Sequence, residues 1–231
     1  MKSAETIFLI ILMTFAPNMG LQAQDWPNLA EFQEANQKLE APAADEDRVV
    51  FMGNSITIGW LKKRPEFFEG KPYVNRGISG QTTPQMLVRF RQDVVYLKPK
   101  VVVILAGTND IAGNTGPSTL KMIADNIKSM AEIAHVNGIK VVLSSTLPAY
   151  DYPWKPGVEP APKIVELNKM IKSYAEENGH VYLDYFSAMA DERNGLPKKY
   201  ANDEVHPTIE GYKVMEPLVE EAIAEALSKK R

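Results

Sequence analysis

The chain has 231 residues, of which 45% are hydrophobic and 24% are charged. This composition is typical of a globular protein with a buried core, and it excludes a chain that is disordered over most of its length. With 26 basic and 29 acidic residues the net charge is −3, which excludes the strongly basic surface of many nucleic-acid-binding proteins. There are no cysteines, so disulfides, thiolate metal sites, a cysteine nucleophile and a lipidated cysteine anchor are excluded as well.

The first 23 residues have the features of a secretory signal peptide. Lys2 precedes an apolar run over residues 7–16, and Ala23 is a small residue at a suitable cleavage position. The run is too short to span a bilayer comfortably, and an uncleaved interfacial anchor is the alternative interpretation. We therefore expect a secreted or periplasmic protein of the bacterial envelope, with no stable membrane anchor after cleavage and a single domain over residues 24–231.

The rest of the chain alternates predicted strands with predicted helices. Apolar runs without strict alternation indicate strands buried on both faces, and apolar residues spaced by three and four indicate helices. In the first half of the chain we expect strands at 49–52 and 73–74, a helix from Thr83-Pro84, a strand at 101–105 and a helix over 120–134. In the second half we expect a strand at 139–143, a long loop over 148–162, a helix over 164–174, a strand at 181–183 and a helix over 215–226. This alternation predicts an α/β fold, a three-layer αβα sandwich with about five parallel strands.

Four polar segments follow predicted strands or precede the last helix, where ligands bind in such folds. They are Gly53-Asn54-Ser55-Ile56-Thr57, the stretch 75–82 with Ile78-Ser79-Gly80, Gly107-Thr108-Asn109-Asp110, and Asp203-Glu204-Val205-His206-Pro207. Each also has a purely structural interpretation: a helix N-cap for Ser55, a turn glycine for Gly80, a turn cap for Asn109 and a helix start for His206. Of the other two histidines, His135 is expected at the surface or its boundary, and His180 in a structural role.

Together and in this order, the four segments resemble those of the SGNH, or GDSL-type, serine hydrolase family of esterases and acetylhydrolases. The resemblance covers about residues 47–223. It implies a flavodoxin-like three-layer fold and ester hydrolysis through an acyl-serine intermediate, with no metal and no cofactor.

The resemblance also implies a role for each matching residue. Ser55 is the expected nucleophile, His206 its base, and Asp203 the acid that orients His206. The backbone N–H groups of Ser55 and Gly80 and the side-chain amide of Asn109 would form the oxyanion hole.

The family's aspartate before the nucleophile is replaced here by Asn54. Asn54 keeps the shape and a carbonyl acceptor but adds an N–H donor, so local hydrogen bonding could differ. The competing acids are Asp110, Asp184 and Glu204, of which Asp184 is expected to hold a loop.

The expected substrate is a small-molecule or oligosaccharide ester, most simply an acetylated carbohydrate. Possible substrate contacts are Tyr152 and Trp154 in the proline-rich loop and Trp60 after the nucleophile segment, although all three could instead pack the loop or the core. The alternatives are a lysophospholipase or thioesterase of the same family and a non-catalytic carbohydrate-binding relative. A nucleotide-binding flavodoxin relative fits less well, because the first loop lacks the glycine pattern of a phosphate cradle. No nucleic-acid partner is expected, and the oligomeric state stays open.

Overall fold

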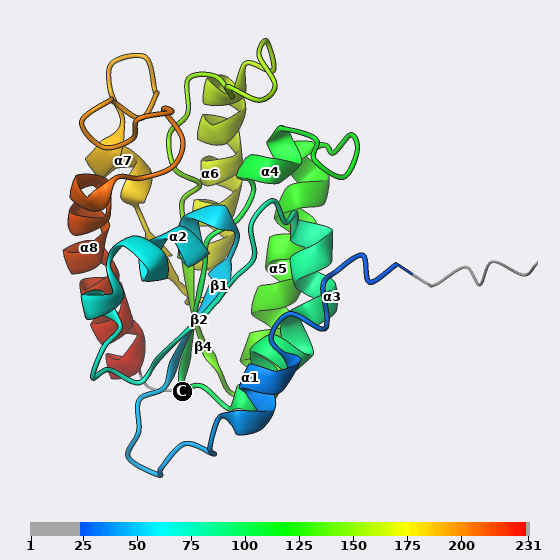
Figure 1. The fold of residues 1–231 in the computed structure, drawn as a ribbon, viewed down its shortest axis with the longest axis vertical. Helices are drawn as coiled ribbons and strands as arrows, with labels where there is room; N and C mark the ends of the chain where they lie inside the picture. Colours follow the sequence, from blue (N-terminus) through cyan, green and yellow to red (C-terminus); the bar gives the residue numbers. More distant parts are fainter. Residues whose placement is uncertain (1–23, 230–231) are drawn as a thin grey trace, which may run out of the picture.

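A computed structural model describes residues 24–229, and its central feature is a parallel sheet of five strands (Figure 1). The predicted signal peptide lies outside the described residues. The strands are β1 (Val49–Gly53), β2 (Tyr73–Gly77), β3 (Val101–Ile104), β4 (Lys140–Ser144) and β5 (Val181–Leu183). They lie in the order β2-β1-β3-β4-β5, which is the flavodoxin-like order. All five predicted strands are thereby confirmed.

The sheet is buried on both faces, as the uninterrupted apolar runs predicted. Successive side chains of a strand point to opposite faces. Val50 and Met52 of β1 therefore belong to one apolar cluster, while Val49 and Phe51 belong to the other. In-register pairing of β1 with β3 continues both clusters across the sheet.

Helices cover both faces and complete the predicted three layers (Figure 1). The cluster that contains Val50 is covered by α3 (Thr83–Asp93), α5 (Leu120–Val136) and α6 (Pro160–Glu177). The cluster that contains Phe51 is covered by α2 (Ser55–Lys63), α7 (Tyr185–Met189) and α8 (Ile209–Ser228). The helix start predicted at Thr83-Pro84 is correct, and Thr82 and Gln85 form a capping box there.

Six helical segments were not predicted from the sequence: α1 (Gln33–Lys38), α2, η1 (Pro65–Phe67), η2 (Val95–Leu97), α4 (Thr108–Ile111) and α7. The expected long loop is present, but it ends earlier than predicted because α6 already begins at Pro160. Within residues 24–229, no helix combines the length and the hydropathy needed to cross a membrane.

Candidate active site

The turn after β1 presents Ser55 at the start of α2. Asn54 is the N-cap of this helix, and its Oδ1 accepts a hydrogen bond from the backbone N–H of Ile56 at 3.2 Å. The residue that departs from the family pattern thus keeps an acceptor role that its amide oxygen can fill. Ser55 Oγ lies 2.9 Å from Nε2 of His206.

His206 is held by Asp203 through a tight turn before α8. Asp203 Oδ1 accepts the backbone N–H groups of Val205 at 3.0 Å and His206 at 2.7 Å. Asp203 Oδ2 lies 2.7 Å from His206 Nδ1. Partial burial alone would raise the pKa of the Asp203 carboxyl, but these hydrogen bonds from His206 and Val205 outweigh it and lower the pKa below its usual value. Asp203 is therefore ionised at neutral pH and can hold a proton on Nδ1, so that Nε2 faces Ser55 as an acceptor.

The turn after β2 lies against the turn that carries Ser55. The backbone N–H of Ile78 donates to the carbonyl of Gly53 at 3.2 Å, which joins the two turns directly. Gly80 has φ +78°, and a Cβ atom built there would have no heavy atom within 4 Å, so this backbone is open to an approaching ligand. At the start of α2, the N–H of Ser55 belongs to the first turn, whose donors have no partner inside the helix.

Asn109 lies beside the same turn. It is on α4 and only 3% exposed, and its Nδ2 donates to the carbonyl of Gln81 at 2.9 Å. This bond uses one of the two amide hydrogens and leaves the other for a second acceptor. The structure thus brings together the four predicted segments at the carboxyl edge of the sheet.

A buried guanidinium beneath these turns was not recognised in the sequence. Arg89 is fully buried on α3, and its Nη2 donates to the carbonyls of Gly53 at 3.1 Å and Arg76 at 2.9 Å. Its Nε donates to Gln81 Oε1 at 2.6 Å, and its Nη1 pairs with the buried Asp93 at 3.0 Å. The available signal was a charged pair at i and i+4 on the apolar face of this helix. Arg89 connects the turn that carries Ser55 to the turn that carries Gly80.

The three aromatic residues predicted as substrate contacts have different environments. Trp60 is 2% exposed and stacks on Tyr212 and Phe67 in the core. The prediction that Trp60 contacts substrate is therefore wrong. Tyr152 is fully buried beneath Trp154, with ring centroids 5.0 Å apart. The prediction that Tyr152 contacts substrate is wrong for the same reason, because its side chain is not accessible. Trp154 is 44% exposed, and its ring lies 5.9 Å from that of His206, so its contact with substrate stays a prediction.

The three acids that could compete with Asp203 have other positions or partners. Asp184 is the N-cap of α7 and accepts hydrogen bonds from the backbone and hydroxyl of Ser187, so its role is structural as expected, but at the start of a helix and not in a loop. Asp110 accepts three hydrogen bonds from Thr83. Glu204 lies in the tight turn between Asp203 and His206, with φ +61°.

The first described segment of the chain contributes a hollow that the sequence did not indicate. Side-chain amides of Gln81, Gln85 and Gln92 donate to backbone carbonyls of residues 26–29 and hold this segment against α3. The result is a hollow of about 390 Å³ next to Gly80, which includes Trp26 in its wall. No local pattern in residues 24–29 signalled this, because the contacts are made by residues more than 50 positions away.

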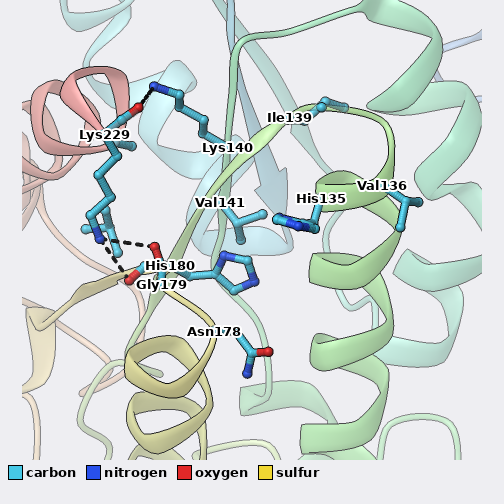
Figure 2. A pocket seen from close by; sticks show the side chains of 12 residues that line it. His135, Val136, Ile139, Lys140, Val141, Asn178, Gly179, His180 and Lys229 are labelled. Carbon is cyan, nitrogen blue, oxygen red and sulfur yellow. Dashed lines mark hydrogen bonds between the residues drawn. The ribbon is translucent and has the colours of Figure 1, made fainter. Parts of the chain in front are cut away.

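A second hollow lies far from these residues, at the amino ends of β4 and β5 (Figure 2). It measures about 540 Å³, and the rings of His135 and His180 lie next to each other there, with centroids 5.9 Å apart and planes inclined by 60°. His135 is exposed and His180 half-buried. Because all strands are parallel, this end of the sheet is opposite to Ser55, so neither histidine can assist it.

Comparison with known proteins places this arrangement in a family. A family model described as GDSL-like lipase/acylhydrolase matches residues 51–214. The chain belongs to the GDSL-like lipase/acylhydrolase family. The resemblance of the four segments is thereby confirmed, and membership of this family supports ester hydrolase activity.

Solved structures agree over nearly the whole described chain. A candidate acylhydrolase from Bacteroides fragilis is 48% identical, with 88% of this chain and 99% of that one covered and a TM-score of 0.86. A GDSL-like lipase from Bacteroides thetaiotaomicron is 46% identical, with 87% and 98% covered and a TM-score of 0.84.

Curated relatives are more distant. The uncharacterized lipoprotein YqeF of Bacillus subtilis is 38% identical over 78 residues, and this match spans only 32% of each protein. An acetylxylan esterase of Geobacillus stearothermophilus is 25% identical over 147 residues, which are 62% of this chain and 67% of that protein.

Proposed function

We propose that this GDSL-family protein is an exported serine esterase that removes short acyl groups, acetyl above all, from carbohydrates. The observation that carries the proposal is the continuous chain of contacts from Ser55 Oγ through the His206 ring to Asp203, 2.9 and 2.7 Å long. A hydroxyl, an imidazole and an ionised carboxylate in this order activate an alcohol oxygen as a nucleophile.

The reaction proceeds in two stages. His206 Nε2 takes the proton of Ser55 as Oγ attacks the ester carbonyl, and the negative charge that develops on the carbonyl oxygen is met by the N–H groups of Ser55 and Gly80 and the free amide hydrogen of Asn109. His206 then returns its proton to the leaving alcohol, which leaves an acyl group on Ser55. Water activated by His206 releases the acid in the second stage. Asp203 stays ionised and stabilises the imidazolium form in both stages.

The walls around Ser55 favour a short acyl group and a polar alcohol. The two hollows that adjoin Ser55 and Gly80 within the described chain measure about 310 and 390 Å³, and Ile58 is the single aliphatic side chain among their lining residues. Trp26 and Trp154, 43% and 44% exposed, offer flat apolar faces on either side, and amides such as that of Asn114 offer hydrogen bonds. Aromatic faces with polar edges suit a sugar better than an alkyl chain. The distant relation to an acetylxylan esterase supports the same choice.

The test is release of acetate from acetylated xylo-oligosaccharides, alongside 4-nitrophenyl esters of increasing chain length. We expect kcat/KM to be highest for acetyl esters, and Ser55→Ala to lose turnover while keeping the wild-type unfolding transition. A steady rise in kcat/KM toward octanoyl and longer esters would favour a lysophospholipase or thioesterase instead. Sugar binding without hydrolysis of any ester would indicate a non-catalytic relative.

Export rests on the sequence of residues 1–23 alone. Expression of the full chain in a bacterial host, followed by N-terminal sequencing of the protein from the envelope or medium, should find Gln24 as the first residue. Recovery of the intact N-terminus would contradict cleavage.

A further inference from the structure

The hollow beside Ser55 is lined by positive charge. Its wall includes Ser55 and His206, and on the same side Lys62 and Lys63 from the end of α2. No carboxylate is among the residues that line this hollow of about 310 Å³. A substrate whose carbonyl carbon lies at Ser55 therefore meets two positive charges on one side.

The geometry of α2 directs one of these lysines toward the site. Ser55, Gly59 and Lys62 are spaced by four and three residues, so they share one face of the helix. Seven residues span about 10.5 Å along a helix, and long helical side chains lean back toward the N-terminus. The Lys62 ammonium can therefore extend from the second turn toward the groups bound at Ser55.

Lys62 is also free of local partners. Its ammonium is exposed and makes no hydrogen bond or ion pair with any described residue. Lys63 differs, because its Nζ donates to the carbonyl of Pro207 at 2.5 Å and is fixed beside His206. Lys63 thus adds a positive charge held by a hydrogen bond, and Lys62 an exposed one without a partner among the described residues.

The carboxylates around α2 are already paired with other cations. Glu66 and Glu216 contact Arg64, Glu210 pairs with Lys213, and Glu220 pairs with Lys71. None of them is paired with Lys62. On the other side of His206, Asp151 and Glu204 line a separate hollow of about 280 Å³. The carboxylates around α2 thus leave the charge of Lys62 without a paired anion.

We infer that the alcohol part of the natural substrate carries an anionic group, a carboxylate or a phosphate, which Lys62 and Lys63 hold while the acyl carbonyl lies at Ser55. This inference rests on the proposed esterase function and names the class of its substrate: short acyl esters of acidic sugars. The anion must be on the alcohol, because an acetyl group has no position for it.

The test compares esters that differ in charge, at low ionic strength. The probes are 4-nitrophenyl acetate, acetylated xylo-oligosaccharide, acetylated oligogalacturonide and an O-acetylated hexose phosphate.

We expect the wild-type protein to prefer one of the two acidic substrates over the neutral oligosaccharide in kcat/KM. We expect Lys62→Gln to reduce the acidic-to-neutral ratio about three- to fivefold, mainly through KM, since an exposed charge interaction contributes at most about 1 kcal/mol. Lys62→Glu should reduce the ratio further, and 0.5 M NaCl should diminish the wild-type preference.

Lys98→Gln is the matched control, because Lys98 is an exposed lysine near the amino end of β3, at the edge of the sheet opposite to Ser55. It should leave the ratio unchanged. The two acidic probes separate a carboxylate from a phosphate as the group that is recognised. Equal kcat/KM for acidic and neutral oligosaccharides, or an unchanged ratio in Lys62→Glu, would overturn the inference while the esterase function stands. If no ester of any charge is hydrolysed, the proposed function itself fails.

Discussion

The side-chain amide of Asn109 shows how single hydrogen bonds prepare this site. One amide hydrogen is held by the carbonyl of Gln81 at 2.9 Å, which sets the orientation of the side chain before any substrate arrives. The second hydrogen is then presented at no further cost in side-chain entropy. In the proposed mechanism, a donor prepared in this way stabilises mainly the transition state, where the carbonyl oxygen becomes an anion.

Replacing Asn109 by alanine should therefore lower kcat for an acetyl ester by about 10²–10³, with little change in KM. Asn126→Ala is a suitable control, because the Asn126 amide also donates one hydrogen bond from a helix, to Thr83 Oγ1, but is not among the residues gathered at Ser55. The measurement is kcat and KM of both variants by steady-state kinetics. A change in Asn109→Ala that is confined to KM would indicate ordinary substrate binding instead.

Substitutions of Asp203 and Asp184, the two aspartates at the carboxyl edge of the sheet, should have different effects. Asp203→Asn removes the carboxylate that holds Nδ1 of His206, and an amide there can favour the wrong tautomer, so kcat should fall by about 10²–10⁴. Asp184→Asn weakens the N-cap of α7 and should lower the melting temperature while leaving kcat at low temperature nearly unchanged. The melting temperature and kcat are measured for both variants. An inactive, stably folded Asp184→Asn would show that the acid is not Asp203.

At the scale of elements, Asp110 connects α4, which carries Asn109, to the N-terminus of α3. Its carboxylate accepts the backbone N–H and the hydroxyl of Thr83 at 2.6–3.1 Å. Burial raises the pKa of Asp110 to about 6, and the hydrogen bonds from Thr83 offset only part of this effect. The contact between the two helices is therefore coupled to pH.

The sign of this coupling follows from the raised pKa. The folded protein holds the Asp110 proton more tightly than the unfolded chain, so the contribution to stability is full below about pH 4 and is lost as the pH rises through about 6. Asp110→Asn cannot titrate at this position. Denaturant unfolding between pH 4 and 7 should show that the free energy of unfolding of the wild type falls relative to that of Asp110→Asn. Parallel pH profiles for the two proteins would contradict the raised pKa.

At the scale of the molecule, Arg89 joins parts of the chain that are remote in sequence. It connects β1, β2 and the following turn to α3, and its partner Asp93 also accepts a hydrogen bond from Asn36 of α1 at 2.7 Å. Arg89 and Asp93 are both fully buried. Removing one member of a buried pair leaves the other charge without compensation.

Arg89→Met should destabilise the fold by about 3–5 kcal/mol, measured by urea unfolding. The control is Lys121→Met, which removes a cation from an i, i+4 pair with Asp125 that is exposed, and it should change stability by less than about 0.5 kcal/mol. Equal effects of the two substitutions would mean that the buried network adds little to stability.

Much of this architecture was determined by the sequence alone. The five strands were correct because a parallel sheet buried on both faces requires uninterrupted apolar runs, which are local patterns. The segments around Ser55, Gly80, Asn109 and His206 could be expected at one edge because the carboxyl ends of parallel strands meet there. Their proximity followed from topology, and their catalytic roles remain a proposal.

Tertiary structure decided what the last residues of α2 and the first described segment do. Trp60 and Lys62 are two residues apart on one amphipathic helix, yet Trp60 is in the core because Tyr212 and Phe67 stack on it, while Lys62 reaches the hollow beside Ser55. Trp26 lies beside Gly80 because glutamines of the turn and α3 hold its segment there. In each case the deciding partner is distant in sequence or belongs to another element. The burial of a side chain depends on which elements pack together, and a local pattern does not contain that information.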